Sequence, residues 1–278
     1  MLKARVLTAL VLLILFAPIF LLLPALDLYL SFIVILSIAA WEWGRFLWPS
    51  NKSSPVIYAF LIFVCLVFLL GQHQDSFESN FLLSKNYLFH YPIYLSAFVW
   101  IFIVPFFLKK SLSVPLTEWI TFLSILGFII FIGVFCAAMV IRDEGRWLFL
   151  GTIGIVWCAD IGAYFVGRKF GKNKLASNIS PGKSWEGVLG GVLIVSLFIF
   201  LIFSMLSDPS FSLFSALLIG VFLAFMSVVG DLFESLLKRI AKVKDSSNLL
   251  PGHGGVLDRI DAILPVLPIA ALLLRVIL

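Results

Sequence analysis

Long apolar stretches recur along the chain, separated by short polar segments. A membrane-spanning helix needs about 20 predominantly apolar residues, and the pattern predicts nine such helices. They cover residues 6–26, 28–47, 56–71, 88–108, 119–141, 147–167, 187–206, 211–230 and 260–277. The apolar residues are continuous and do not alternate with polar ones, which excludes a closed β-barrel. The sequence therefore predicts an all-α, polytopic integral membrane protein.

The first predicted span follows two basic residues, Lys3 and Arg5, as a signal peptide would. Its apolar run is too long for the central region of a signal peptide, and no small-residue cleavage site follows it. We therefore expect a retained helix.

Composition agrees with a membrane protein, because 62% of the residues are hydrophobic and only 13% are charged. The cysteines, Cys65, Cys136 and Cys158, lie singly inside apolar runs, with no paired spacing. This placement favours small core residues over a disulfide framework or a zinc site.

The basic residues are distributed unequally between the two sides of the predicted bundle. If the N-terminus is cytoplasmic, 16 of the 20 lysines and arginines lie on the cytoplasmic side, as the positive-inside rule requires. We divide the chain into residues 1–145, with about five spans, and a catalytic region, 146–278. That region carries two long basic cytoplasmic loops, 168–186 and 231–259.

Ionisable residues concentrate between Ser227 and Asp261, where 11 of them occur within 35 residues. Asp231, Glu234 and Lys238 have a spacing that places them on one face of a helix, with Ser235 beside them. A glycine-rich loop, 251–255, and then Asp258 and Asp261 follow. Carboxylates, basic residues and accessible backbone N–H groups together indicate a site for a polyphosphate and a divalent cation. Oxygen ligands of this kind suit Mg²⁺.

Acidic residues also occur within predicted spans. Asp160 lies in the sixth span, where an acid is energetically costly, and we favour a functional role over a structural ion pair. Glu42, between Trp41 and Trp43, is interpreted as an interfacial residue at a helix end and is assigned no role. His73 and His90 are interpreted as structural.

The segment 177–187, SNISPGKSWEG, has some features of a phosphate-binding loop. It is not a P-loop, because Ser177 stands where the first glycine is required and no strand is predicted before it. Ser180, Lys183 and Ser184 still offer donors, and Glu186 precedes a glycine-rich helix start. On spacing alone, phosphate binding and an ordinary basic loop near lipid headgroups remain equally open.

The catalytic region resembles the phosphatidate cytidylyltransferases, also called CDP-diacylglycerol synthases. The resemblance is closest over 235–261, SLLKRIAKVKDSSNLLPGHGGVLDRID, where we find no departure from the family signature. It extends to Gly230–Glu234, to Ser180–Gly187, and to Asp160 with the glycine-containing segment after it. The first five spans match in hydrophobic character only.

The resemblance implies an all-helical bacterial inner-membrane enzyme with its active site facing the cytoplasm. It implies transfer of CMP from CTP to phosphatidate, giving CDP-diacylglycerol and pyrophosphate, with Mg²⁺ as cofactor. The expected partners are CTP, phosphatidate in the bilayer and membrane lipids, without nucleic acid; a homodimer is left open. The catalytic residues implied are Asp231, Lys244, Asp245, His253, Asp258 and Asp261, with Asp231, Asp258, Asp261 and Asp160 as metal ligands. The substrate-binding residues implied are Ser180, Lys183, Ser184, Glu186, Glu234, Ser235, Lys238, Arg239, Gly254, Gly255 and Arg259.

Two other classes of protein fit parts of the pattern. A transporter would place its ionisable residues near the membrane midplane within repeated halves, whereas here they gather at one face without a repeat. A lipid kinase that uses CTP would share the helices and basic loops. The product distinguishes it, because only a cytidylyltransferase transfers the cytidine group into lipid.

Overall fold

The structure is a computed structural model that describes residues 24–74, 87–110, 116–206, 212–250, 252 and 254–277. The first predicted span, 6–26, lies almost entirely outside these ranges. His253, predicted as a catalytic residue, also lies outside them.

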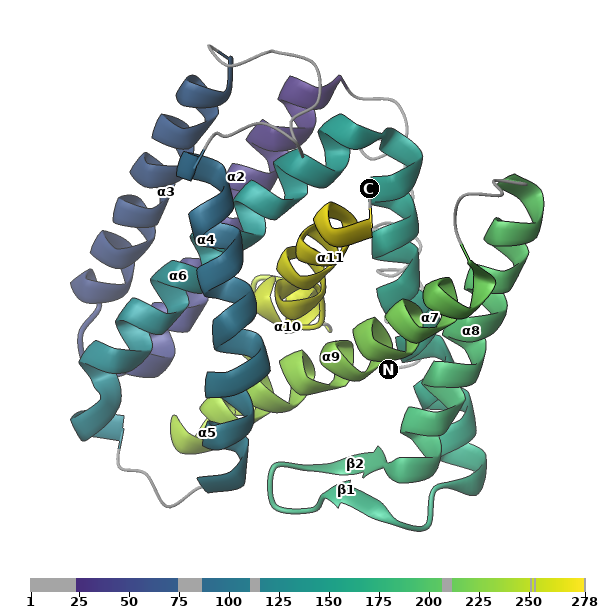
Figure 1. Cartoon of the computed structure of the whole chain (residues 1–278). Helices are drawn as coiled ribbons and strands as arrows, with labels where there is room; N and C mark the ends of the chain where they lie inside the picture. Colours follow the sequence, from purple (N-terminus) through teal and green to yellow (C-terminus); the bar gives the residue numbers. More distant parts are fainter. Residues whose placement is uncertain are drawn as a thin grey trace.

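Helices make up most of the described chain (Figure 1). They are α2 (Ala25–Leu47), α3 (Ser53–Gln74), α4 (Tyr87–Phe98), η1 (Val99–Ile103), α5 (Val104–Lys110), α6 (Leu116–Glu144), α7 (Arg146–Phe170), α8 (Trp185–Leu206), α9 (Leu213–Ile240), α10 (Leu257–Ile260) and α11 (Ile263–Ile277). Within the described residues, seven helical segments are long and apolar enough to cross a membrane. The prediction of a polytopic helical membrane protein is therefore confirmed in its class, although not in its number of spans.

The predicted spans between residues 28 and 206 agree with the helices to within three residues at each end. The last two do not. Helix α9 continues to Ile240, ten residues beyond the predicted end at 230, so much of the predicted loop 231–259 is helical. The predicted ninth span is instead the short α10, a turn and the 15-residue α11. A helix of that length rises only about 22 Å, less than the thickness of the hydrocarbon core.

One predicted loop contains a small sheet. Strands β1 (Lys174–Ala176) and β2 (Ser180–Ser184) pair in antiparallel fashion and form a hairpin between α7 and α8. The expectation that no strand precedes Ser177 is therefore wrong, and the all-α assignment omits this hairpin. Figure 1 shows the hairpin at one end of the bundle, below α9.

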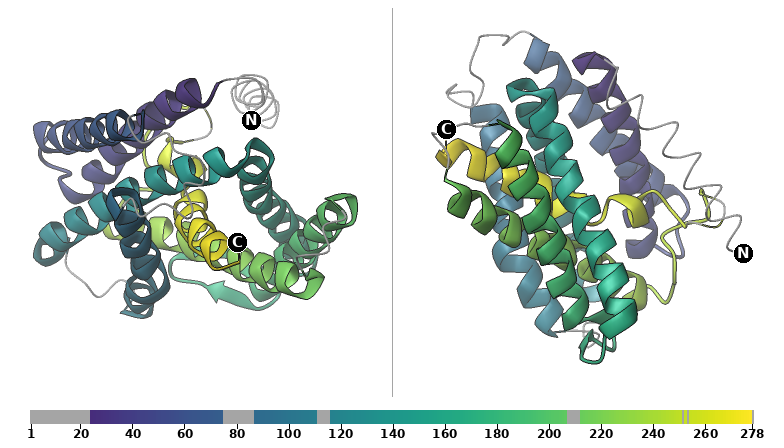
Figure 2. Two further views of the ribbon diagram at one scale, coloured as in Figure 1. Left: turned by 45° about the horizontal axis from the view of Figure 1, so that its top comes forward. Right: turned by 90° about the vertical axis from the view of Figure 1, so that its right-hand side faces the viewer.

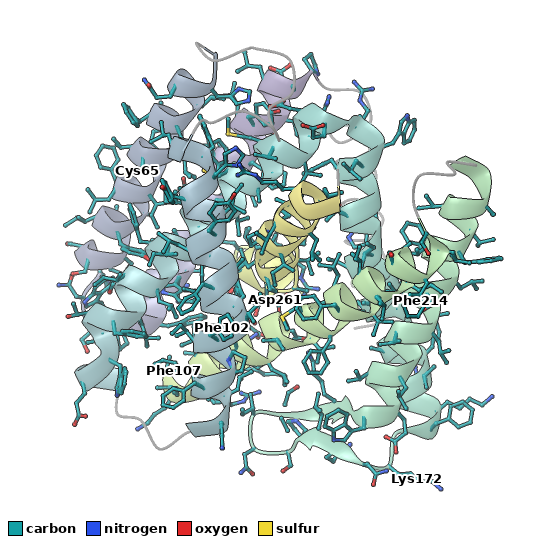
Figure 3. All side chains as sticks on the ribbon, viewed as in Figure 1. Cys65, Phe102, Phe107, Lys172, Phe214 and Asp261 are labelled. Carbon is teal, nitrogen blue, oxygen red and sulfur yellow. The ribbon has the colours of Figure 1, made fainter. Side chains whose placement is uncertain are left out.

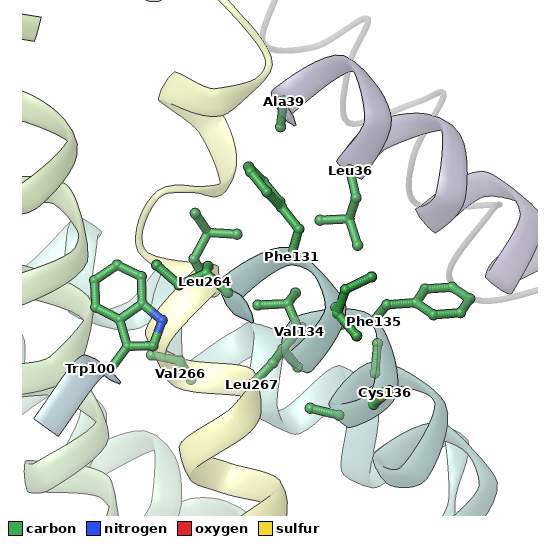
Figure 4. Close-up of a cluster of buried hydrophobic side chains, with 14 of the residues drawn as sticks. Leu36, Ala39, Trp100, Phe131, Val134, Phe135, Cys136, Leu264, Val266 and Leu267 are labelled. Carbon is green, nitrogen blue, oxygen red and sulfur yellow. The ribbon is translucent and has the colours of Figure 1, made fainter. Parts of the chain in front are cut away.

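Helix α11 lies inside the bundle, where it contacts α4, α6, α7 and α9; Figure 2 shows it surrounded by other helices. Its apolar side chains meet those of α2, η1 and α6 in the core (Figure 4). The set drawn there includes Leu36, Trp100, Phe131, Phe135, Val266 and Leu267, all nearly or fully buried. Because α11 is packed in this way, the turn that precedes it has a fixed position against α9.

Contacts at the two ends of the bundle establish how the first helices alternate. Near one end, Tyr29 of α2 and His73 of α3 both contact Asp143 of α6, the latter through an ion pair of 2.6 Å. Near the other end, the Trp43 Nε1–H donates to the Leu123 carbonyl over 3.2 Å. Helices α2 and α6 are therefore antiparallel, as the predicted alternation requires, and His73 has the structural role expected of it.

Candidate functional site

The charged face predicted for residues 231–238 is present on α9. The Lys238 Nζ lies 2.5 Å from Glu234 Oε2, and the Ser235 hydroxyl donates to Asp231 Oδ1 over 3.3 Å. Glu234, Ser235 and Lys238 are buried, although they are polar. The helix can continue through this charged segment because its side chains find partners within the protein.

A first group of charges surrounds Asp231. The Lys183 Nζ, on β2, lies 2.6 Å from Asp231 Oδ2, so the hairpin contacts α9 directly. Asp160 of α7 and Asp261, between α10 and α11, are close enough to Asp231 to interact electrostatically with it and with Lys183. We refer to Asp160, Asp231 and Asp261 as the carboxylate cluster. Figure 3 shows Asp261 in the interior of the bundle, next to α9.

Gly230 permits this close approach of α9 to the turn before α11. A Cβ at this position would lie 2.4 Å from the Asp261 carbonyl oxygen and 2.8 Å from Pro265 Cγ. Either distance is shorter than a Cβ tolerates without displacement of the backbone. The absence of a side chain at 230 therefore helps to bring Asp231 and Asp261 together.

The carboxylate cluster has the donor chemistry of a site for a hard cation, since every candidate ligand is a carboxylate oxygen. Among the residues that the structure describes, no three Asp, Glu, His or Cys side chains form a preassembled metal-binding group. Mg²⁺ commonly binds one or two carboxylates together with substrate phosphates and water, without an all-protein cage. The three carboxylates have the donor chemistry of such an open site.

Asp258 makes a different set of contacts. Its Oδ1 accepts from the Lys238 ammonium over 2.6 Å, and its Oδ2 accepts from the Gly255 N–H over 2.7 Å. The Ser246 N–H also donates to Oδ2 over 3.0 Å, and the Ser246 hydroxyl oxygen lies 2.9 Å from the same atom. Both oxygens of Asp258 are thus engaged, one by Lys238 of α9 and the other by the loop, and metal binding by Asp258 would require some of these bonds to be released.

The hydrogen bonds determine the acidity of Asp258. Burial alone raises its pKa, but the interaction with neighbouring Glu234 and the hydrogen bonds from the Gly255 N–H, Lys238 and the Ser246 N–H outweigh burial and lower the pKa to about 2. Asp258 is therefore an anion throughout the physiological pH range. It holds the loop 241–256 against the end of α9.

Gly254 and Gly255 shape this loop. Gly254 has a φ of +81°, which L side chains rarely adopt, and a Cβ there would lie 2.4 Å from Asp258 Oδ2. Its carbonyl accepts from the Leu250 N–H over 2.9 Å. The predicted site residues Lys244 and Asp245 are exposed beside it, where a soluble nucleotide could reach them.

Several residues that were predicted to bind substrate make structural contacts in the hairpin region. Ser184 is buried and its hydroxyl accepts from the Gly187 N–H over 3.2 Å, at the start of α8. Glu186 accepts from the Asn173 side-chain amide over 2.8 Å. The Arg239 Nε–H donates to the Ile179 carbonyl over 3.2 Å and so joins the hairpin to the end of α9. Ser180 lies on β2, close along the strand to Lys183.

Glu42 is the residue that sequence reasoning missed. The interpretation of Glu42 as an interfacial residue is wrong, because its side chain is completely buried. It accepts hydrogen bonds from the loop next to Asp258, more than 200 positions further along the chain. Its position inside the second predicted span was a usable signal, since the same argument identified Asp160.

Comparison with known proteins gives a consistent result. A model of the cytidylyltransferase family matches residues 3–277. A phosphatidate cytidylyltransferase of Pseudomonas aeruginosa is 37% identical over 282 aligned residues, covering 99% of this chain and 97% of the relative. Phosphatidate cytidylyltransferases of Haemophilus influenzae and Bacillus subtilis are 51% and 47% identical over shorter regions. These regions cover 45% and 43% of this chain, and 44% of each relative.

Proposed function

The chain belongs to the cytidylyltransferase family, and we propose that it is a phosphatidate cytidylyltransferase, which transfers CMP from CTP to phosphatidate. The products are CDP-diacylglycerol and pyrophosphate. The assignment agrees with the membrane-spanning helices, since an acceptor with acyl chains resides in the bilayer.

One structural observation carries the proposal. Lys183 of the hairpin contacts Asp231 of α9 beside Asp261 and Asp160, so one basic and three acidic groups from four separate elements meet at one place. A reaction between two anions needs such an arrangement, because their charges must be neutralised while they approach each other.

The chemistry requires no covalent attachment to the protein. A phosphate oxygen of phosphatidate attacks the α-phosphorus of CTP, and the bond from that phosphorus to the bridging oxygen breaks, releasing pyrophosphate. In this proposal Lys183, which is paired with Asp231, and the exposed Lys244 bind phosphate oxygens, with Arg259 as a further cation near Asp160. Lys238 and Arg239 contribute indirectly, since they fix the loop and the hairpin.

We include Mg²⁺ in the proposal, held by Asp231 and Asp261 with Asp160 nearby. Such an ion stabilises negative charge on the phosphates of the bound nucleotide. Asp258 stays a candidate ligand from the sequence, but its contacts favour a role in holding the loop. In the same proposal the hairpin and the loop 241–256 face the cytoplasm, where CTP is available.

A test of the reaction uses full-length protein purified in detergent, with phosphatidate, Mg²⁺ and CTP labelled in separate experiments. We expect label from the cytidine ring to enter lipid and label from the γ-phosphate to leave as pyrophosphate. Lipid labelled from the γ-phosphate but not from cytidine would reject the proposal and indicate a lipid kinase.

The metal assignment is tested with Asp231→Asn and Asp261→Asn, titrated with Mg²⁺. We expect both variants to keep the thermal stability of the wild type and to lose more than about 99% of turnover, since each removes charge from the reacting site. The exposed Glu118 offers a matched control, Glu118→Gln. Full wild-type activity in excess EDTA would contradict the metal assignment.

A further inference from the structure

Glu42 forms the most densely bonded buried contact between α2 and the C-terminal loop. Its Oε1 accepts from the Ser247 hydroxyl over 2.5 Å and from the Val256 N–H over 3.0 Å. Its Oε2 accepts from the Ser246 hydroxyl over 3.0 Å and from the Leu257 N–H over 2.6 Å. Each carboxylate oxygen therefore faces one backbone donor and one hydroxyl donor, the single hydroxyl hydrogen of Ser246 being shared with Asp258, and the side chain has no exposed surface.

These donors lie immediately around the predicted site. The Ser246 hydroxyl is within hydrogen-bond distance of both Glu42 and Asp258, so it lies between the two carboxylates. Leu257 directly precedes Asp258. One turn along α2 from Glu42, the Arg45 guanidinium donates to the Ser246 carbonyl over 3.3 Å. Helix α2 thus holds Ser246 at both its side chain and its backbone.

Gly255 is shaped by the same contact. A Cβ at this position would lie 2.3 Å from Glu42 Oε1 and 2.0 Å from the Ser246 hydroxyl oxygen. A glycine is required here because the Glu42 carboxylate from α2 packs directly against the Gly255 backbone. Of these two neighbouring glycines, Gly254 has a positive φ and Gly255 does not, so it is the close approach of Glu42 that explains the glycine at 255.

We propose that Glu42 is a positioning residue for the cytidylyltransferase reaction, which fixes the conformation of the loop 245–257 and thereby places Asp258, Arg259 and Asp261. The proposal rests on the proposed function for its activity readout. Glu42 does not touch substrate in this assignment, because it is buried and both oxygens are occupied. Glu42 belongs to residues 1–145, a region to which we assigned no chemical role from the sequence.

A carboxylate is needed at this position because all of its contacts are donors. In Glu42→Gln, either orientation of the amide directs an NH₂ group at a backbone N–H, of Val256 or of Leu257. A hydroxyl can rotate to accept such a hydrogen, but a backbone N–H cannot. The neutral isostere therefore leaves a buried backbone donor without an acceptor.

The experiment compares full-length wild type, Glu42→Gln, Glu42→Asp and the exposed control Glu118→Gln. Three quantities are measured: turnover of CTP with phosphatidate, thermal stability, and hydrogen exchange of peptides from 244–250, 254–260 and the α6 core. For Glu42→Gln we expect turnover to fall on the order of 100-fold, as misplacement of reacting groups by about 1 Å can cause. Exchange should accelerate at 254–260 while it is unchanged in α6, and Glu42→Asp should recover part of both losses.

Two outcomes would overturn the proposal. One is Glu42→Gln with wild-type turnover and wild-type exchange at 254–260. The other is exchange that accelerates equally in α6, since this would indicate a general loss of stability and no local positioning. If Glu42→Gln does not fold, Ser247→Ala serves instead. It removes one donor to the Glu42 carboxylate together with the acceptor of the Leu249 N–H, so the decisive exchange is that of 254–260, where the same expectations apply in weaker form. Should the wild type prove inactive with CTP and phosphatidate, the proposed function fails, while the exchange data still decide the role of Glu42.

Discussion

Replacing Lys238 by methionine should destabilise the fold strongly, because Lys238 is paired with two buried acidic side chains. Its ammonium lies 2.5 Å from Glu234 and 2.6 Å from Asp258, whose side chains are only 3% and 8% exposed. Methionine keeps most of the apolar stem and removes the charge. Two neighbouring carboxylates would then remain in the interior without their shared cation.

The magnitude follows from this burial. Removing one partner of a buried ion pair typically costs about 3–5 kcal/mol, mostly because the other charge is left unpaired. Solvent screening is small here, since the Lys238 side chain is only 11% exposed. For a chain of this size such a loss corresponds to a decrease in Tm on the order of 10 °C.

The assay is thermal unfolding of the purified protein in detergent, followed by circular dichroism. The double variant Lys238→Met/Glu234→Gln removes one of the two acidic groups left without Lys238 and should recover part of the lost stability. The matched control is Lys174→Met, because Lys174 is an exposed residue of β1. This change should alter stability by less than about 0.5 kcal/mol. The reasoning is refuted if Lys238→Met is as stable as the wild type, or if Glu234→Gln makes it less stable still.

Three further predictions follow from the structure. The pKa of Asp258 is lowered to about 2 from an ordinary 3.8. Its contribution to stability is therefore complete above about pH 5 and is lost as the pH falls from about 4 to 2. Asp258→Asn should remove this part of the pH dependence of Tm. Gly230→Ala should lower turnover at least about tenfold by displacing α9 from Asp261, whereas Gly71→Ala, with open space around its Cβ, should not. A cysteine at the exposed Ser177 should react with impermeant reagents from the cytoplasmic side only, and labelling only from outside would contradict the orientation.

Features that depend on neighbours along the chain were predictable. The apolar runs gave the helices between 28 and 206, since both the length and the apolarity of a span are local properties. The spacing of Asp231, Glu234 and Lys238 gave their shared face, because the helical repeat alone determines it. The Lys238–Glu234 ion pair, four residues apart, follows from the same geometry.

Features that depend on distant partners were not predictable. Glu42 acts on residues 204 to 215 positions away, and no periodicity reports such a contact. The extension of α9 to Ile240 was missed because a run of charges normally ends a span; here Asp258, 20 residues further on, neutralises Lys238. The hydrogen bond from Arg239 to the Ile179 carbonyl, 60 residues earlier, was likewise not visible in the sequence.

The division of the site into two groups of charges has a consequence for how variants should behave. The contacts of Glu42, Lys238 and Asp258 are buried and bind the loop to α2 and α9. Their loss leaves an unpaired charge or polar group in the interior, and it should therefore lower stability together with activity. Asp231 and Lys183 are more accessible, with side chains 36% and 23% exposed, so water can solvate whichever partner is left. Changes there should lower activity with little loss of stability, because an accessible ion pair contributes at most about 1 kcal/mol to folding. The loop is therefore held by buried charges, whereas Lys183 and Asp231, the ion pair that we propose opens to admit substrate, are accessible to water.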